Sequence, residues 1–404
     1  MKLKLRKMAS NFALYLFFAF ILINLPQAIY GSAEFERRAI YSSLGVDRVE
    51  EGYEVSGIVI IQSTPDSTSS NAQLVSASGR DFSEALYRLS VELGKEIGFA
   101  HCDTFIVSDS LKDEDVAKVL DFSVRGSKLT QNSKIITCKG SAKEVLQVNM
   151  DKKDEIGISL ARSITNSSDY LSISDIDLQE FFNLYYSKSG ICWTTVVEVK
   201  DDSESKEGKE ESGESGGQEE NKKKIASEGQ VAVYKKGKLQ YIVEGDMANI
   251  INIINPYTKM GYIHLEDIDD GEKHIEQISL QIIEKSTTRK YYFDGDTACC
   301  DVGVKLYLNV LSLKTDSIDV NEISETKTHI SDNVKRAIVE YMTKNFDEYS
   351  DVCREYKVDF FNLTNQLYRL KNKKFKEIVT LDDEQNGYIE NSRYNLKVEI
   401  KSKL

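Results

Sequence analysis

His101 and Cys102 form the one place in the sequence where a thiol and an imidazole stand side by side. Adjacent side chains at the start of a strand point to opposite faces, so this pair lacks the mutual hydrogen bond that activates a cysteine nucleophile. The pattern favours a structural role over catalysis. The remaining histidines, His264, His274 and His329, are too dispersed to indicate a metal site or a catalytic base.

Two acidic stretches contain the residue types of a calcium loop. They are "DIDDGEKH", with Asp267, Asp269 and Asp270, and "DGDTACCD", with Asp294, Asp296 and Asp301. Neither stretch has the full ligand spacing and terminal glutamate of an EF-hand loop. We therefore interpret both as polar turns.

The cysteines lack the CxxC spacing of zinc sites and redox motifs. They are Cys102, Cys138, Cys192, Cys299, Cys300 and Cys353. An exported chain permits disulfides, but a chain of this size does not depend on them, so we predict buried free thiols. Cys299 and Cys300 lead into a strand pattern, which should point their side chains to opposite faces.

Common catalytic signatures are absent from the sequence. It contains no GxGxxG, Walker loop, GxSxG or HExxH, which removes the usual support for nucleotide binding and hydrolase chemistry. We therefore predict no catalytic residue, no cofactor and no metal ligand, and we assign no ligand-binding residue.

The composition is that of an ordinary globular protein of more than one domain. The chain has 404 residues, of which 41% are hydrophobic, and a formal net charge of −13. No basic face is evident in the sequence that could neutralise phosphates, so nucleic acid is not expected as a partner.

The N-terminus has the pattern of a secretory leader. The basic stretch "MKLKLRK" precedes an uncharged run from Phe12 to Ile23, and small residues follow. The longer apolar run from Met8 to Leu25 is near the lower limit for spanning a bilayer. A cleaved leader and a retained membrane anchor both remain open, and residues 1–33 are assigned to this segment.

Behind the leader, strand and helix patterns alternate through residues 34–190. Strands are expected at 39–47, 53–61, 103–108 and 133–138, and helices at 80–94, 111–124, 141–148, 155–164 and 177–187. Asp81 with Glu84, and Ser141 with Glu144, have capping-box spacing, and Gly94 ends the first helix. This alternation predicts an α/β domain with partly parallel pairing.

Residues 191–275 are expected to form a small middle domain. A strand at 191–200 leads into the acidic, Ser- and Gly-rich segment 201–227, which cannot bury enough apolar area to order itself and is predicted to be a disordered insertion. A hairpin over 229–243 turns at Lys236 and Gly237. A helix over 247–254 should be capped by Asp246 and end at Asn255.

Strict alternation of apolar and polar residues marks the strands of residues 276–404. The apolar positions are Ile278, Leu280 and Ile282; Val302, Val304, Leu306, Leu308 and Val310; and Tyr394, Leu396, Val398 and Ile400. This period of two is typical of a sheet with one covered face. Helices at 331–346 and 359–370 should supply the cover, which predicts an α+β C-terminal domain. The fold class is therefore α/β and α+β, with three domains of mixed sheet and packed helices.

Five segments in order resemble the Ger(x)C family, the C-type subunits of bacterial spore germinant receptors. They are "LGVD" at 44–47, "SGRDFSEALYRLS" leading to "FAHCDTFIVSDSL", "VLDFSVRG" with "CKGSAKEVL", the hairpin "GQVAVYKKGKLQYIV", and "YKVDFFNL". His101 stands at the family's usual histidine, Arg125 also matches, and Asp359 opens the aromatic-rich turn of the last segment.

The resemblance implies a non-catalytic protein required for spore germination. Family members are extracytoplasmic lipoproteins on the outer face of the spore inner membrane, and they act with integral-membrane A-type and B-type subunits. A small-molecule germinant would then be a partner only indirectly, and whether this chain contacts it at all stays open. The alternative is an unrelated extracytoplasmic, membrane-attached ligand-binding or scaffold protein.

The family's lipidation motif is altered in this chain. "AEFERRAI" stands where the family reads Gly-Cys-Trp-Asp-x-Arg-Glu-Ile, so that Glu34 replaces the lipidated cysteine. Thioether attachment requires a thiol, so lipidation at this position is excluded. The alignment places a processing point between Ala33 and Glu34, where Gly31 and Ala33 are small residues that a signal peptidase accepts.

Overall fold

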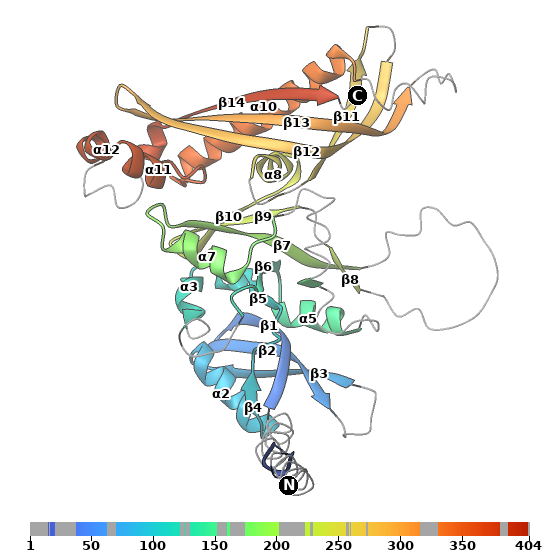
Figure 1. Ribbon diagram of the computed structural model, residues 1–404, viewed down its shortest axis with the longest axis vertical. Coiled ribbons are helices and arrows are strands. Elements are labelled where there is room, and N and C mark those ends of the chain that lie inside the picture. The colour runs from blue at the N-terminus through green and yellow to red at the C-terminus, as the bar shows by residue number, and fades with distance from the viewer. Residues whose placement is uncertain are drawn as a thin grey trace, which may run out of the picture.

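The computed structural model describes most of the chain behind the leader. The described residues are 15, 17–20, 38–62, 70–121, 125, 130–151, 160–161, 174–201, 223–226, 229–255, 258, 260–271, 274–315, 330–379 and 387–402. Their strands form two sheets, one above the other along the long axis in Figure 1. The expected fold class of mixed sheets with packed helices is confirmed.

The first sheet holds ten strands among the described residues. In spatial order the main path is β10 (Lys238–Val243), β9 (Val231–Lys235), β7 (Ile191–Asp201), β6 (Lys134–Lys139), β5 (Thr104–Ser108), β1 (Arg38–Val49), β2 (Gly52–Gln62) and β3 (Ser70–Gly79). Strand β4 (Glu96–Gly98) pairs with β1, and β8 (Lys223–Ala226) pairs with β7. Strands β1, β5, β6 and β7 run parallel to one another, as the alternating pattern predicted.

Helices cover both faces of this first sheet. Helices α2 (Phe82–Leu93), α3 (Val116–Val119) and α7 (Leu178–Tyr185) share one core with Phe105 of β5, whereas α5 (Ala142–Asp151) forms a second core with Ile106. A short 3-10 turn, η1 (Asp109–Leu111), follows β5. Every residue of β5 is buried, which explains why its sequence is apolar without alternation.

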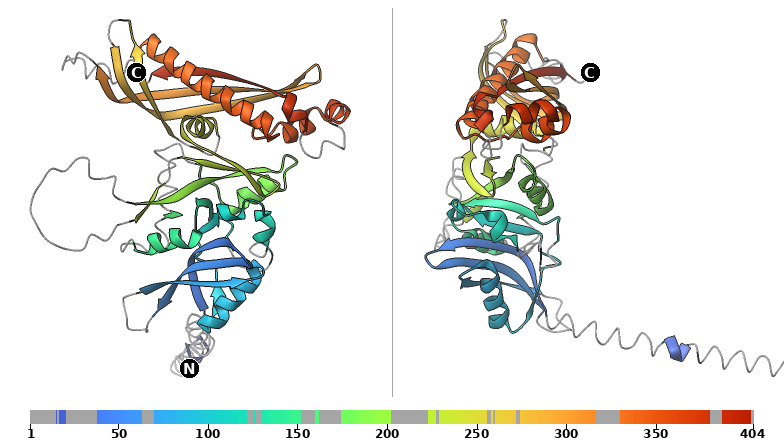
Figure 2. Two further views of the ribbon diagram at one scale, coloured as in Figure 1. Left: turned by 180° about the vertical axis from the view of Figure 1, so that it is seen from behind. Right: turned by 90° about the vertical axis from the view of Figure 1, so that its left-hand side faces the viewer.

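The second sheet is a four-stranded antiparallel array with one parallel edge. Its order is β11 (Gly261–Asp269), β12 (His274–Asp294), β13 (Thr297–Thr315) and β14 (Arg393–Ser402). Helix α10 (Asp332–Glu355) crosses one face, as seen from behind in Figure 2. Helices α11 (Leu363–Leu370) and α12 (Asn372–Ile378) and the 3-10 turn η4 (Gly387–Asn391) complete this half. The period-two prediction is confirmed on β13, where Val302 to Val310 are buried at alternate positions.

The segment expected to be a middle domain contributes strands to both sheets. Strands β7, β9 and β10 extend the first sheet, whereas β11 is the edge of the second. Between them lies α8 (Gly245–Ile254), whose isoleucines are buried. The division into three domains stays a prediction, but these strands belong to two sheets and form none of their own.

Two details differ from the predictions. Asp246 does not cap α8, because Glu244 occupies the N-cap position and Asp246 lies inside the helix, where it accepts a hydrogen bond from Tyr341. Within the segment predicted to be disordered, residues 223–226 form β8, which pairs with the end of β7. Lys224, Ile225 and Ala226 of this strand are half-buried, although the sequence of the strand does not alternate between polar and apolar residues.

The predicted N-cap Asp81 and C-terminal Gly94 of α2 are confirmed. The Asp81 carboxylate accepts a hydrogen bond from the Glu84 backbone N–H at 2.8 Å, and Gly94 adopts the left-handed conformation at the end of α2. The hairpin turn at Lys236 and Gly237 has positive φ at both residues, as a two-residue turn of this kind requires.

Among the described residues, no helix is both long and apolar enough to cross a membrane. The leader prediction for residues 1–33, with the processing point at Ala33 and Glu34, lies almost wholly outside that part of the chain. Most of the predicted helix 155–164 and His329 lie outside it too.

Candidate functional site

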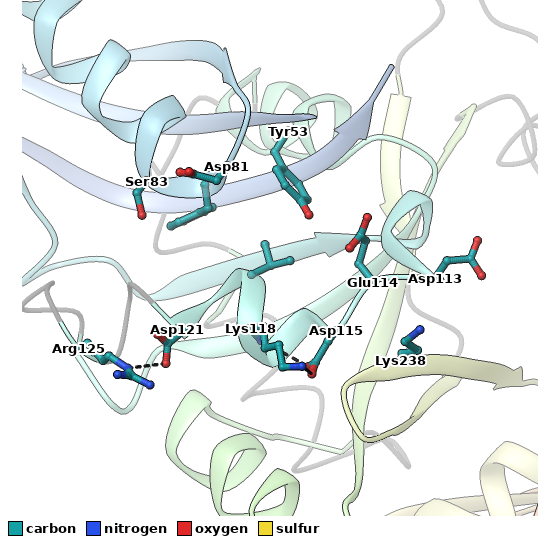
Figure 3. Close-up of a pocket in the computed structure, with 12 residues that line it drawn as sticks. Tyr53, Asp81, Ser83, Asp113, Glu114, Asp115, Lys118, Asp121, Arg125 and Lys238 are labelled. Carbon is teal, nitrogen blue, oxygen red and sulfur yellow. Dashed lines mark hydrogen bonds and ion pairs between the residues drawn. The ribbon is translucent and has the colours of Figure 1, made fainter. Parts of the chain in front are cut away.

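An open cleft of about 690 Å³ lies on the first half of the molecule (Figure 3). Tyr53 of β2 and the start of α2 form one wall, and the loop before α3 forms the other, with the β9–β10 turn at one end. Its lining residues are Tyr53, Asp81, Phe82, Ser83, Asp113, Glu114, Asp115, Lys118, Val119, Asp121, Arg125 and Lys238.

Four of the eight charged side chains that line the cleft are paired with one another. Asp115 accepts a hydrogen bond from the Tyr185 hydroxyl at 3.0 Å and lies 3.3 Å from the Lys118 ammonium. Arg125, one of the family-matching residues, pairs with Asp121 at 2.8 Å. These contacts hold the short helix α3 in place, and the exposed pairs contribute little stability on their own.

The lining offers polar groups and no activated nucleophile. Neither cysteine nor histidine occurs among the residues that line the cleft in the described part of the chain. Burial raises the pKa of Tyr53 above its ordinary value of 10, so this phenol is protonated at neutral pH. The cleft can therefore hold a small polar group, but its residues do not form a nucleophile–base pair.

The thiol that drew attention in the sequence is chemically inert. Cys102 is fully buried, and burial raises the pKa of its thiol to about 12, so the reactive thiolate is not populated near neutral pH. His101 beside it is exposed, and the thiol lies 3.5 Å from the Thr104 carbonyl instead. The structural interpretation of this pair is supported.

All six cysteines are free and buried, as predicted. Cys299 and Cys300 follow each other along β13, and only Cys300 belongs to the main apolar core. This agrees with opposite faces for the two side chains.

The acidic side chains of the two stretches stabilise turns and the ends of secondary-structure elements. Asp269 accepts a hydrogen bond from the Gly271 backbone N–H at 2.9 Å, and Asp270 accepts one from the Ser331 hydroxyl at the start of α10. In the second stretch Asp294 pairs with Arg393 at 2.9 Å, and Asp301 accepts a hydrogen bond from Tyr292. No group of three or more potential metal ligands occurs in the described residues.

The "LGVD" segment holds α5 against the first sheet. The carboxylate of Asp47 accepts hydrogen bonds from the backbone N–H groups of Ala142 at 2.8 Å and Lys143 at 3.1 Å. A Cβ on Gly45 would come within 2.9 Å of the Ala142 side chain, so glycine permits the close approach. The sequence marked this segment, but its capping role comes from residues 95 positions apart.

The "YKVDFFNL" segment uses the same device in the second half. The Asp359 carboxylate accepts hydrogen bonds from the backbone N–H groups of Leu363 at 2.7 Å and Thr364 at 2.8 Å, at the start of α11. Asp359 is only 1% exposed, and burial raises the pKa of its carboxyl to about 6. This carboxylate is therefore a structural group whose pKa lies well above that of an ordinary aspartate.

Aromatic rings around Asp359 join the two halves of the molecule. Phe360 packs on Trp193 of β7, with ring centroids 4.9 Å apart, and on Tyr349 of α10 at 5.2 Å. Tyr356 lies 4.9 Å from Tyr241 of β10. We call this set of rings the aromatic junction, and it places the family's C-terminal segment directly on its middle hairpin.

A partly buried lysine joins the second sheet to helix α8. Lys285 of β12 donates hydrogen bonds to the carbonyls of Ile253 and Asn255, each at 2.7 Å, at the C-terminal end of α8. Burial, and then the neighbouring Arg289, lower the pKa of Lys285 to about 7. Nothing in the sequence marked this residue, because a bulge in β12 after Ile282 shifts the alternation.

Comparisons with known proteins bear on both halves of the chain. A family model described as "Spore germination protein N-terminal domain" matches residues 31–199, and one described as "Spore germination B3/ GerAC like, C-terminal" matches residues 229–403. A solved structure titled "Crystal Structure of the GerBC protein" aligns with 88% of this chain and 96% of its own, at 13% identity and a TM-score of 0.47. No curated protein matches the chain.

Proposed function

Because the chain belongs to the GerAC-like family of spore germination proteins, we propose that it is a non-catalytic, membrane-associated subunit of a spore germinant receptor. The observation that carries the proposal is the match of both family models, in order. Family membership argues against the alternative of an unrelated extracytoplasmic, membrane-attached ligand-binding or scaffold protein.

The absence of catalysis is proposed on the chemistry of the described side chains. The fully buried thiols of Cys102 and Cys353 have pKa values raised to about 12 by burial, which removes the thiolate that nucleophilic chemistry needs. The family segments hold caps and packing surfaces at Asp47 and Asp359. These roles suit a protein that holds partners in place.

Single replacement of each cysteine by serine tests the non-catalytic proposal. We expect losses on the order of 1–3 kcal/mol where a thiol is well packed, and germination that follows the amount of protein in the spore. A variant that abolishes germination at unchanged abundance would contradict the proposal.

The partners are proposed to be the integral-membrane A-type and B-type subunits, at the outer face of the spore inner membrane. The basic and apolar N-terminus supports export across that membrane. Affinity purification of the tagged full chain from detergent-solubilised spore membranes should recover polytopic proteins. Recovery of the chain without any membrane protein, under conditions that preserve other membrane complexes, would contradict the assignment.

Attachment without a lipid is the remaining part of the proposal. Since Glu34 replaces the family's cysteine, we propose that the leader is retained as an anchor with its basic end inside. N-terminal sequencing of the protein from the membrane fraction should find the leader intact. A mature start at Glu34, after cleavage at Ala33, would contradict the anchor and leave attachment to the partner subunits.

A further inference from the structure

A strongly basic segment stands out on this acidic protein. Between residues 369 and 377 the chain has five basic residues and one acidic residue, although its total charge is −13. The basic residues are Arg369, Lys371, Lys373, Lys374 and Lys376. They lie at the end of α11 and along α12, at the left edge of Figure 1.

Lysines of the first sheet extend this segment into one surface. The backbone N–H of Lys188, just after α7, donates to the Asn365 side chain at 3.2 Å. Its ammonium lies 3.9 Å from the centre of the Tyr368 ring, and Lys376 approaches the same ring at 5.8 Å. The backbone N–H of Lys236 in the β9–β10 turn donates to the Gly190 carbonyl at 2.7 Å. We call the surface formed by Lys188, Lys236 and the five residues of 369–376 the basic edge.

The basic edge also carries exposed apolar side chains. Leu370 at the end of α11 is 54% exposed, and Tyr186 beside Lys188 is 71% exposed. Arg369, Lys371, Lys373 and Lys376 are themselves exposed. Exposed apolar residues within a basic surface are the composition of proteins that lie on a membrane interface.

We propose that the basic edge lies against the anionic headgroups of a lipid bilayer. Clustered lysines near an anionic surface each add favourable electrostatic energy, and the attraction extends over about a screening length. Leu370 and Tyr186 then enter the interface between headgroups and acyl chains. The inference deepens the proposed function and rests on its membrane association, for which it supplies a contact on the folded body.

The residue types favour lipid over an acidic protein as the occupant. Six of the seven basic residues of the basic edge are lysines. Protein–protein interfaces are enriched in arginine and depleted in lysine, because arginine holds carboxylates in a fixed bidentate geometry. Flexible lysine ammonium groups suit a surface of mobile headgroups, where no fixed geometry is required.

Fluorescence quenching by lipid tests this contact in the full chain. A bimane dye is attached to Lys376→Cys, and the native cysteines do not compete because all six are buried. The protein is reconstituted in vesicles of phosphatidylcholine and phosphatidylglycerol at a ratio of 3:1, with headgroup spin-labelled lipid as the quencher. The matched control carries the dye at Lys397→Cys, an equally exposed lysine on β14.

We expect quenching at position 376 to exceed that at position 397 at least threefold. It should fall to the control level in pure phosphatidylcholine, and also when salt rises from about 0.1 M to about 1 M, which shortens the screening length from about 10 Å to about 3 Å. Adding Lys371→Gln and Lys373→Gln should lower it, whereas Lys290→Gln and Lys401→Gln on the open face of the second sheet should not.

Equal quenching at the two positions would overturn the proposal. Quenching that does not depend on the charge of the lipid would overturn it as well. Saturable binding of poly-glutamate at position 376 without quenching by anionic vesicles would also overturn it and would assign the surface to an acidic protein. The vesicles contain no receptor subunits. A negative result in this experiment therefore contradicts the lipid contact alone, and the co-purification experiment still tests the proposed receptor partners.

Discussion

Asp47 and Asp359 perform the same task in the two halves of the molecule under different conditions. Each carboxylate accepts two backbone N–H groups at the start of a helix, α5 for Asp47 and α11 for Asp359. Asp47 retains 7% exposure and has a serine hydroxyl nearby, whereas Asp359, which precedes Phe360 of the aromatic junction, retains 1%. Burial raises the pKa of both carboxyls.

The difference shows that the stability contributed by a capping carboxylate depends on how deeply the carboxylate is buried. A cap at a wet surface replaces water and contributes modestly, since water can take over when the carboxylate is removed. A cap in a dry aromatic site leaves two orphan N–H groups when it is removed. Removal of Asp359 should therefore cost more than removal of Asp47, although the local contacts are nearly identical.

The largest effect is expected for Asp359→Ala. The variant leaves the N–H groups of Leu363 and Thr364 buried without an acceptor, so the unfolding free energy should fall by about 3 kcal/mol at pH 7. Urea unfolding followed by circular dichroism measures it. Asp296→Ala in the exposed β12–β13 turn serves as the control, with a change below about 0.5 kcal/mol. An equal change for the two variants would show that the cap is unimportant.

Asp47→Ala should have an intermediate effect. Asp47 retains slightly more exposure than Asp359, so the expected loss is about 1–2 kcal/mol, within the usual range for a helix N-cap. The same unfolding experiment measures this loss. A loss larger than that of Asp359→Ala would break the argument that burial sets the cost.

Titration of Asp359 should make the second half of the molecule sensitive to pH. Its folded pKa of about 6 lies above the ordinary aspartate value of 3.8, so the native state retains the proton to higher pH. The associated stability is present below about pH 4 and is lost as pH rises through about 6. Leu363, Thr364 and the opposing charge of Arg289 limit the shift.

Comparison with Asp359→Asn isolates this titration. The amide stays neutral, so the stability advantage of the natural protein over the variant should shrink by about 2 kcal/mol between pH 4.5 and pH 7.5. Unfolding curves at a series of pH values provide the measurement. A difference that stays constant over this range would mean that Asp359 does not titrate there.

The smallest effect is expected for Asp81→Ala at the start of α2. This cap makes one hydrogen bond to the Glu84 N–H at an exposed position, so the loss should stay below about 1 kcal/mol. Thermal unfolding should show the order Asp359, Asp47 and Asp81 in decreasing size. Any other order would show that burial does not determine how much stability a cap contributes.

Local patterns predicted the elements best where their signals were self-contained. The cap and αL glycine of α2 and the turn at Lys236 and Gly237 each depend on residues within a few positions. The prediction was wrong at the start of α8, where Glu244 and not Asp246 occupies the N-cap position. It missed β8 because four residues in a charged segment carry no visible alternation.

The sequence by itself determined the family, the apolar faces and the turns, because spacing along the chain encodes them directly. Only the tertiary structure decided what the marked residues do. Asp47 meets α5 across 95 positions, and Lys285 reaches the end of α8 across 30. Long-range pairing and a bulge in β12 set these contacts, and a one-residue shift of a strand turns every following side chain to the other face. The basic edge arises in the same way, because Lys188 and Lys376 meet at Tyr368 only after both sheets have packed.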